Sequence, residues 1–380
     1  MNKTSLAGGQ LMQITCPKEI LLDKLQIVSK TVATKSAMPV LSGIRVSRLS
    51  DEMMELASTD MDLSLRLAVN ASIEGQGAVV APGRLLTDVV RSLPAGDVLM
   101  NINTSEQTAT VTSGQATFTL NCLPAADFPR LPEIREEDTF DVEKNPLMAT
   151  INTVARAASR DETRPVLTGI LVKFKKETLK MVSTDSYRLS VRETGARSSL
   201  PEKRAIIVPR TSLEELARLC SGSDAENVKV SIVDGQIIFG INETILASRL
   251  IEGQFPNYQQ LLPDEFKHEI SIDRDEILEV IARIGLMAQK NAPLRLRFTS
   301  GEITVSAQTP QVGEASEAVP VSYTGEEIEV GFNPEFLRDG FESVDEEQAF
   351  LRVISPLRPG LIKGSGDDFL YLIMPVRLSA

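Results

Sequence analysis

The sequence predicts an α+β protein built from three tandem homologous domains, each with two helices packed on antiparallel sheets. A repeated phrase is the main reason: residues 39–44, PVLSGI, return as residues 165–170, PVLTGI, 126 positions later. The tripeptide STD at residues 58–60 returns at residues 183–185, 125 positions later. A displacement this constant indicates duplication of a unit of domain size, which is long enough to bury a core of its own.

A third copy of the unit is fainter. Residues 302–306 resemble residues 178–182, and residues 330–334 resemble residues 206–209. Three units of about 127 residues fill the 380 residues of the chain, and short acidic connections containing proline join them. We therefore expect domains at 11–137, 138–267 and 268–380.

The first unit should open with a helix, because Leu21, Leu25, Val28 and Val32 recur at steps of three and four. Alternating apolar and polar residues then predict antiparallel strands, and a second helix should begin near Pro82, since a missing N–H costs nothing in a first turn. We expect strands around residues 44–46, 54–56, 63–69, 98–102, 109–111 and 118–120. The second helix should bury a stripe of Leu85, Leu86, Val89, Val90 and Leu93.

The second and third units should repeat the order of helix, strands, helix and strands. Pro209 and Pro334 stand where Pro82 stands in the first unit. Apolar periodicity predicts the four helices near residues 147–158, 213–220, 277–287 and 336–344.

The composition is that of an ordinary globular protein, with 42% hydrophobic and 24% charged residues. No run approaches 18 apolar residues, and residues 1–10 lack the apolar centre of a secretory signal, so we expect a cytoplasmic protein with no membrane partner. Cys16, Cys122 and Cys220 are widely spaced and form no CxxC pair. We expect them to be buried as small hydrophobic side chains.

Enzymatic function is disfavoured by the residues. The single histidine, His268, lies in an acidic stretch, where we expect a solvated linker, and any histidine-dependent triad or zinc–water site would depend on this one ring. The sequence has no phosphate-binding loop, dinucleotide-binding fingerprint or nucleophile-elbow motif. We expect no catalytic residues, no cofactor and no metal site.

The charge is unevenly distributed along the chain, whose formal net charge is −12. Residues 18–35 contain four lysines and only two acidic residues, and the predicted helices at 82–95 and 146–160 are also basic. The fourth helix is neutral and the last two are acidic. This partial segregation favours a surface that faces a polyanion, although an acidic chain repels phosphate elsewhere.

Several motifs in register resemble the bacterial β sliding clamp, the processivity subunit of the replicative DNA polymerase. They are the triplicated unit, LPAADFP at 123–129, TD at 184–185 followed by YRL at 187–189, and YLIMPVRL at 371–378. The resemblance covers about residues 11–378, so residues 1–10 are expected to be an unstructured extension.

The resemblance implies a head-to-tail homodimer closed into a ring of six similar domains around duplex DNA, with helices lining the hole and sheets forming the rim. Such a ring slides on DNA without reading sequence and tethers the polymerase, the clamp loader and repair proteins. By resemblance, DNA-facing residues map to Lys35, Arg84 and Arg210. The subunit contact maps to Phe118, Leu120, Leu286 and Met287.

The resemblance also implies a pocket between the second and third domains that receives short linear peptides from these partners. Its apolar C-terminal segment agrees with a binding role, because a chain end is usually polar and frayed. Met and Leu also make an adaptable surface. The pocket maps to Arg164, Leu167, Thr184, Ser186, Tyr187, Arg188, Leu189, Pro256, Leu261, Leu372, Met374, Pro375, Val376, Arg377 and Leu378.

The alternative is an acidic scaffold protein or an unrecognised metal-dependent hydrolase that uses Asp60, Asp62 and Asp185. Asp60 and Asp185 occupy equivalent positions in two repeats. A structural turn would recur in this way, whereas a single active site would not. We therefore favour the DNA-encircling platform.

Overall fold

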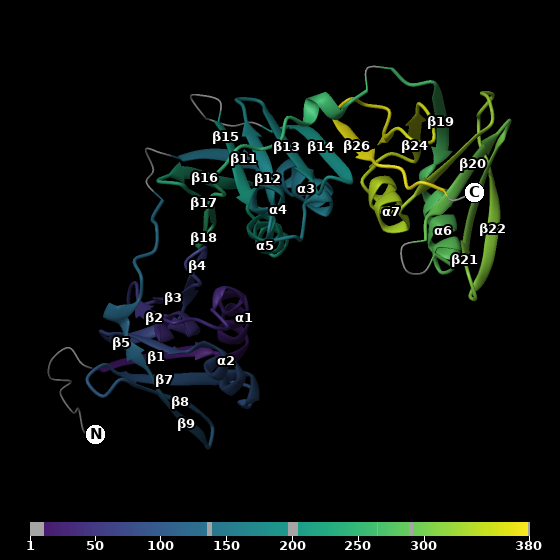
Figure 1. Cartoon of the computed structure of the whole chain (residues 1–380). Coiled ribbons are helices and arrows are strands. Elements are labelled where there is room, and N and C mark those ends of the chain that lie inside the picture. Colours follow the sequence, from purple (N-terminus) through teal and green to yellow (C-terminus); the bar gives the residue numbers. More distant parts are fainter. Residues whose placement is uncertain (1–10, 135–138, 197–203, 264, 289–291, 379–380) are drawn as a thin grey trace. The chain divides into compact units, whose positions relative to one another are not determined.

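The computed structural model describes residues 11–134, 139–196, 204–263, 265–288 and 292–378 (Figure 1). These residues form two compact units: residues up to 141 with 219–249, and residues 142–218 with 250–378. The central domain is therefore divided between the units, because its two sheets continue into different neighbours. Among the described residues, no helix is long and apolar enough to cross a membrane.

The helices confirm the predicted alternation of helices and strands. Each domain has one helix after its first strand and a second helix after its fifth or sixth. The helices are α1 (Lys18–Val28), α2 (Gly83–Ser92), α3 (Lys144–Val154), the short α4 (Pro165–Thr168), α5 (Arg210–Ser221), α6 (Arg274–Gly285) and α7 (Pro334–Glu342).

The strands repeat with the same order in each domain. The first domain holds β1 (Leu11–Pro17), β2 (Gly43–Arg48), β3 (Met53–Thr59), β4 (Leu63–Asn70), β5 (Ser72–Gly75), β6 (Ala78–Pro82), β7 (Asp97–Asn103), β8 (Thr108–Ser113), β9 (Ala116–Asn121) and β10 (Leu123–Pro124). The second holds β11 (Thr139–Glu143), β12 (Gly169–Phe174), β13 (Thr178–Thr184), β14 (Arg188–Gly195), β15 (Arg204–Pro209), β16 (Asn227–Val233), β17 (Gln236–Ile241) and β18 (Thr244–Arg249). The third holds β19 (His268–Asp273), β20 (Leu294–Thr299), β21 (Glu302–Thr309), β22 (Gly313–Pro320), β23 (Ile328–Phe332), β24 (Gln348–Val353), β25 (Gly360–Lys363) and β26 (Phe369–Ile373).

Sheet topology shows the threefold repeat directly, including the faint third copy. The order β1-β7-β8-β9 recurs as β11-β16-β17-β18 and as β19-β24-β25-β26. The order β6-β2-β3-β4 recurs as β15-β12-β13-β14 and as β23-β20-β21-β22. Antiparallel pairing of β4 with β18 and of β14 with β26 joins neighbouring domains into continuous sheets.

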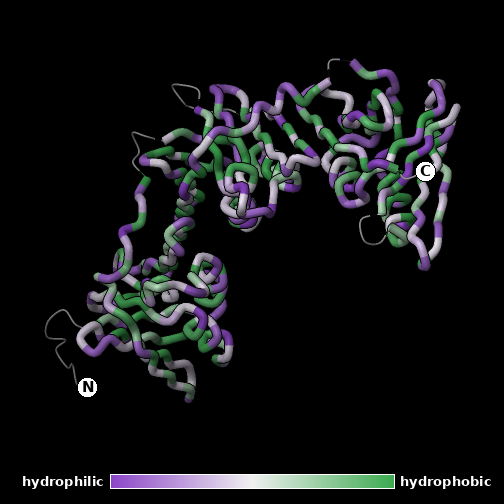
Figure 2. Tube along the Cα trace, viewed as in Figure 1, coloured by the Kyte–Doolittle hydropathy of each residue, from purple (hydrophilic) through white to green (hydrophobic). Residues whose placement is uncertain are grey.

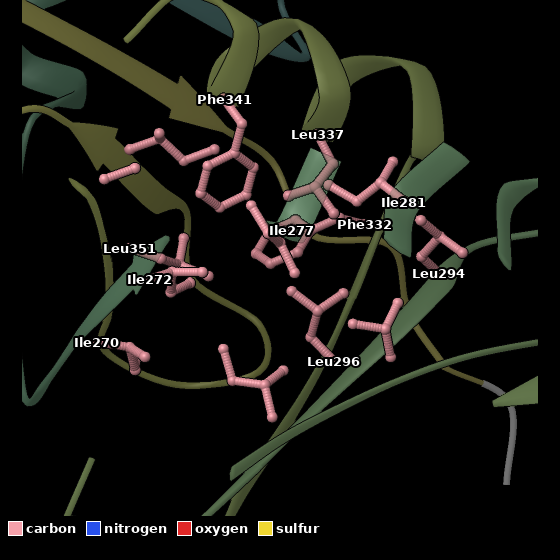
Figure 3. Packing of buried hydrophobic residues seen from close by; sticks show 14 of the residues in the cluster. Ile270, Ile272, Ile277, Ile281, Leu294, Leu296, Phe332, Leu337, Phe341 and Leu351 are labelled. Carbon is pink, nitrogen blue, oxygen red and sulfur yellow. The ribbon is translucent and has the colours of Figure 1, made fainter. Parts of the chain in front are cut away.

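Each domain buries its own core between helices and strands. In the third domain the core combines residues of both helices with residues of both sheets, and Figure 3 shows them pointing toward one another. Apolar and polar segments alternate along the chain in Figure 2, as expected where strands bury one face. The labelled core residues are Ile270, Ile272, Ile277, Ile281, Leu294, Leu296, Phe332, Leu337, Phe341 and Leu351.

Two expectations from the sequence are wrong. Leu85 is 51% exposed, because α2 buries the stripe of Leu86, Val89 and Val90, and Leu85 lies beside it. His268 does not lie in a solvated linker: it begins β19, and its Nδ1 lies 2.7 Å from the hydroxyl of Tyr323.

The three cysteines are buried, as predicted. Burial raises the pKa of the Cys16 and Cys122 thiols to about 11, so they stay protonated at neutral pH. Apolar surroundings and protonation make these cysteines structural rather than reactive.

Candidate functional site

A tight turn between β13 and β14 organises the candidate site. Oδ1 of Asp185 accepts the backbone N–H groups of Tyr187 at 2.9 Å and Arg188 at 3.0 Å. Ser186 has φ +81°, a left-handed conformation that favours glycine. The hydroxyl of Thr184, which is buried, donates to the carbonyl of Arg188 at 2.7 Å. The turn holds the Tyr187 side chain in solvent, 62% exposed.

The same turn occurs in the first domain. Oδ1 of Asp60 accepts the backbone N–H groups of Asp62 at 3.0 Å and Leu63 at 2.8 Å, and Met61 has φ +82°. Asp60 and Asp185 therefore serve as turn residues in both repeats. In the part of the chain that the structure describes, no group of three or more His, Cys, Asp or Glu side chains could hold a metal ion.

The C-terminal segment is held by two backbone hydrogen bonds, one to the second domain and one to the third. The N–H of Met374 donates to the carbonyl of Tyr187 at 2.8 Å, and the N–H of Val376 donates to the carbonyl of Gly331 at 2.8 Å. A Cβ on Gly331 would lie 2.8 Å from the backbone carbonyl oxygen of Val376, so only glycine lets the segment approach this closely. The segment places Met374 and Arg377 in solvent.

An apolar cluster lies beneath this surface and spans the second and third domains. Leu189 and Leu372 face each other across β14 and β26, and Tyr258 packs on them from the connection between the domains. That connection exposes Pro256 and Leu261 beside the buried Tyr258. Tyr187, Leu261 and Met374 thus make an exposed apolar rim around a buried apolar floor.

Leu357 is a neighbouring residue that sequence reasoning missed. It is 64% exposed in the connection between β24 and β25. Gly360 pairs with Ile373, so the residues before Gly360 emerge at the same end of the sheet as Met374. The sequence offers no signal for it, because a leucine between Pro356 and Arg358 is exposed here only through the way the strand ends meet.

Arg164 borders the turn from the other side. Its Nε donates to Oδ2 of Asp161 at 3.0 Å, and its Nη1 donates to the hydroxyl of Ser186 at 3.0 Å. The hydrogen bonds from Thr163 and then the one from Arg164 lower the pKa of Asp161 below its usual value. Leu167, half-buried in α4, lies one helical turn after Arg164, and its N–H donates to the Arg164 carbonyl at 2.9 Å. The guanidinium is therefore fixed beside the turn that carries Tyr187.

Arg188 differs from the other predicted site residues, because its side chain is buried. Its Nη1 donates to Asp339 of α7, its Nε donates to Oδ2 of Asp185 at 3.0 Å, and its guanidinium carbon lies 4.1 Å from the ring centroid of Phe336. Burial alone would lower the pKa of Arg188, but the phenol of Tyr371 and the two carboxylates raise it above its ordinary value. Arg188 therefore ties the second domain to the third beneath the exposed rim.

The first two domains differ in the side chains that their equivalent strands carry near the junction with the next domain. In the first domain Glu55 is 3% exposed; its Oε1 accepts from Nη2 of Arg45, and its Oε2 accepts from Nε of Arg66 at 2.9 Å and from Nη2 of Arg66 at 2.7 Å. We call these three residues the ion triad. Burial raises the pKa of Glu55, but Arg66 and Arg45 together hold it below its usual value. The second domain has Leu171 and Val191 at the positions of Arg45 and Arg66. Apolar side chains thus replace the arginines of the ion triad in the second domain, while the first domain keeps a separate apolar cluster of Val40, Leu41, Ala57, Val80 and Phe128.

Comparison with known protein families identifies the family of the chain. The description "DNA polymerase III beta subunit, N-terminal domain" matches residues 12–132, "central domain" matches 141–257, and "C-terminal domain" matches 259–377. The chain belongs to the DNA polymerase III beta subunit family.

Relatives of the family match nearly the whole chain. The beta sliding clamp of Streptomyces coelicolor is 33% identical and covers 97% of this chain and 100% of its own. A Pseudomonas aeruginosa DnaN sliding clamp bound to griselimycin is 31% identical, with a TM-score of 0.89, over 98% of this chain and 100% of its own. The C. crescentus beta sliding clamp, described with PEG bound to a "putative beta-motif tethering region", is 29% identical, with a TM-score of 0.90, over 98% of this chain and 100% of its own. Beta sliding clamps are replication processivity factors and not enzymes.

The residues expected to face DNA in a beta subunit lie on helices or beside them. Lys35 is exposed after α1, and Arg84 is exposed in the first turn of α2. Arg210 begins α5, where its Nη1 donates to Oε1 of Glu214 at 2.6 Å. Arg210 is thus partly neutralised by its own helix, whereas Lys35 and Arg84 form no ion pair within the part of the chain that the structure describes.

The residues expected at a subunit contact of the beta subunit family lie on β9 in the first domain and just after α6 in the third. Phe118 is exposed on β9 and Leu120 is buried on the same strand. Leu286, just after α6, is 75% exposed, and Met287 packs against the core of the third domain. Sheet order places β9 at the end of one sheet and β22 at the end of another.

Proposed function

We propose that this chain is the ring subunit that encircles duplex DNA and keeps the replicative polymerase and its accessory proteins attached to it. The observation that carries the proposal is the match of all three beta subunit domains, in order, along the chain. This function implies that the protein is cytoplasmic. The domain boundaries that we propose remain at residues 137 and 267.

The proposed partner site is the exposed apolar rim between the second and third domains. Tyr187, Leu261 and Met374 supply large apolar side chains over a buried floor, and the backbone of the turn and of the C-terminal segment is already hydrogen-bonded. A preorganised apolar site suits a short linear peptide, because little of the binding energy is lost in ordering the receptor. Arg164 beside the rim offers a fixed cation for a polar end of such a peptide.

Head-to-tail closure is supported by the repeat of the junctions. β18 and β26 each accept a strand of the preceding domain, and β9 is their counterpart in the first domain. β4 and β14 each supply that strand, and β22 is their counterpart in the third domain. Among the described residues, no strand pairs with the outer edge of β9 or β22. We propose that β22 of one copy pairs with β9 of another, which closes a ring when two chains supply six domains.

Binding to DNA would be electrostatic and independent of sequence. Lysine and arginine on helices contact phosphates without reading bases, so affinity falls steeply as salt rises. A closed ring on circular DNA would instead be held by topology.

The test uses a nicked circular plasmid loaded with this protein by a bacterial clamp loader and ATP, followed by gel filtration. We expect the protein to travel with the circle and to leave it after a restriction enzyme linearises the plasmid. An acidic scaffold would not be retained on the circle, and a hydrolase would degrade it. Retention that survives linearisation would overturn the encircling function.

A further inference from the structure

A buried charge network connects α7 of the third domain with the turn that carries Tyr187. Asp339 of α7 is 7% exposed and accepts a hydrogen bond from Nη1 of Arg188. The other oxygen of Asp339 lies 3.6 Å from Nη1 of Arg156. The hydroxyl of the fully buried Tyr371 lies 3.5 Å from Nη1 of Arg188. Asp339 is therefore a buried carboxylate whose charge is balanced by arginines of the second domain.

From Arg188 the contacts continue to the exposed rim without a gap. Nε of Arg188 donates to one oxygen of Asp185, and the other oxygen of Asp185 accepts the N–H of Tyr187. The carbonyl of Tyr187 in turn accepts the N–H of Met374. Asp339 thus orients Arg188, Arg188 fixes the plane of the Asp185 carboxylate, and that carboxylate fixes the turn between the two exposed side chains of the rim.

The first junction shows that the turn can form without an arginine. The turn at Asp60 has the same two hydrogen bonds, and the N–H of Arg249 donates to the carbonyl of Asp62 at 2.9 Å, as Met374 does to Tyr187. Leu63 stands there at the position of Arg188. The arginine and its carboxylate are therefore additions at the junction with the apolar rim, and are not needed to make the turn itself.

We infer that Asp339 is a positioning residue of the peptide site: it holds the rim in its binding geometry through Arg188 and Asp185. The inference rests on the proposed function of that site. Removing one partner of a buried charge pair leaves the other charge uncompensated, so the partner reorients or takes up water. Without Asp339, Asp185 would be the one acidic partner left to Arg188 among the described residues. A reoriented Arg188 would then displace the carboxylate that holds the Tyr187 turn.

The experiment compares Asp339→Asn with Glu342→Gln in the full-length protein. Glu342 is a matched control, because it lies on the same helix, loses the same charge and pairs with Arg156 at an exposed position. The probe is a short fluorescein-labelled peptide rich in Gln, Leu and Phe, titrated by fluorescence polarisation well below the melting temperature. We expect Asp339→Asn to raise the dissociation constant about fivefold or more, the scale of couplings between contacting residues, and Glu342→Gln to change it less than twofold.

A double-mutant cycle with Tyr187→Ala separates positioning from general destabilisation. If Asp339 acts through the turn, Asp339→Asn should weaken binding much less when Tyr187 is already truncated. Hydrogen exchange should also rise in residues 185–188 in Asp339→Asn and stay unchanged in Glu342→Gln. Should Asp339→Asn fail to fold, Asp339→Glu keeps the charge while displacing it, and we expect it to weaken peptide binding while the protein remains folded.

The outcomes separate this inference from the function on which it rests. If the wild type binds the peptide, deletion of residues 374–378 abolishes binding, and the folded Asp339 variants bind like the wild type, the positioning role is wrong and the peptide site stands. Additive effects in the cycle would likewise overturn it. If the wild type does not bind the peptide, both the site and the inference fail.

Discussion

Two engineered cysteines should join two copies of the chain if β22 of one copy pairs with β9 of the other. The register follows from the junctions within the chain: Arg66 lies opposite Ile245 in the first, and Val191 lies opposite Leu370 in the second. Carried to the third repeat through the strand registers, the same position is Ser316 opposite Thr117 of the second copy. The variant is therefore Ser316→Cys with Thr117→Cys.

Antiparallel geometry gives the expected separation. Directly opposed residues have Cα atoms about 4.5 to 5.5 Å apart, and a disulfide spans about 4.4 to 6.8 Å between Cα atoms. The control is Ser316→Cys with Asn121→Cys, on the same strand and the same face as Thr117. Four residues at a rise of about 3.4 Å displace this pair by about 14 Å along the strand, too far for a disulfide.

The assay is mild oxidation followed by electrophoresis without reductant. We expect a covalent species of twice the 41.5 kDa chain mass from Ser316→Cys with Thr117→Cys, and monomer from the control. The native cysteines are buried and should not contribute. Equal cross-linking by both variants would refute the register. No cross-linking by either, in protein that light scattering finds dimeric, would place the subunit contact away from these two edges.

Four further outcomes are expected. Replacing Leu286 and Met287 with charged residues should yield monomers by light scattering. The exposed Leu286 would no longer offer an apolar side chain to the proposed subunit contact. Deleting residues 374–378 should leave the dimer intact but weaken binding of the peptide by about 2 kcal/mol or more in fluorescence polarisation. Glu55→Gln should lower the free energy of unfolding by about 2 kcal/mol in denaturant titration, because it leaves the ion triad with two half-buried arginines and no carboxylate. Glu193 is hydrogen-bonded by two lysines that lower its pKa from 4.5 to about 2, so its ionised form stabilises the fold above pH 4.5, and the stability advantage of the wild type over Glu193→Gln should shrink as pH falls from 4.5 toward 2; an advantage independent of pH would contradict this.

The repeat made most of the fold predictable from the sequence. Nearly identical phrases such as PVLSGI and PVLTGI revealed the first two domains, and the positions of Pro82, Pro209 and Pro334 located the second helix of all three. The third domain was predicted more weakly, because its strands keep the topology but few of the residues. Leu85 was misplaced because adjacent leucines at 85 and 86 leave the stripe ambiguous until the helix start is known.

The candidate site was predictable only in part. The residues of the turn and the C-terminal segment follow from a resemblance, and the structure brings Tyr187, Met374 and Arg164 together around the turn. Asp339 and Leu357 carry no local signal, because their importance depends on which strand ends meet in three dimensions. The burial of Arg188 likewise depends on a helix about 150 residues further along the chain.

The pairing of β14 with β26 has a consequence for the integrity of the chain. Five opposed residue pairs and the buried contact of Arg188 with Asp339 join the second and third domains without using the connecting segment. The covalent connection through residues 250–267 is therefore only one of several links between the second and third domains. A protease that cut this segment would leave two fragments that remain docked as a non-covalent pair, so the polypeptide could be nicked, or its ends relocated there, while keeping the same sheet.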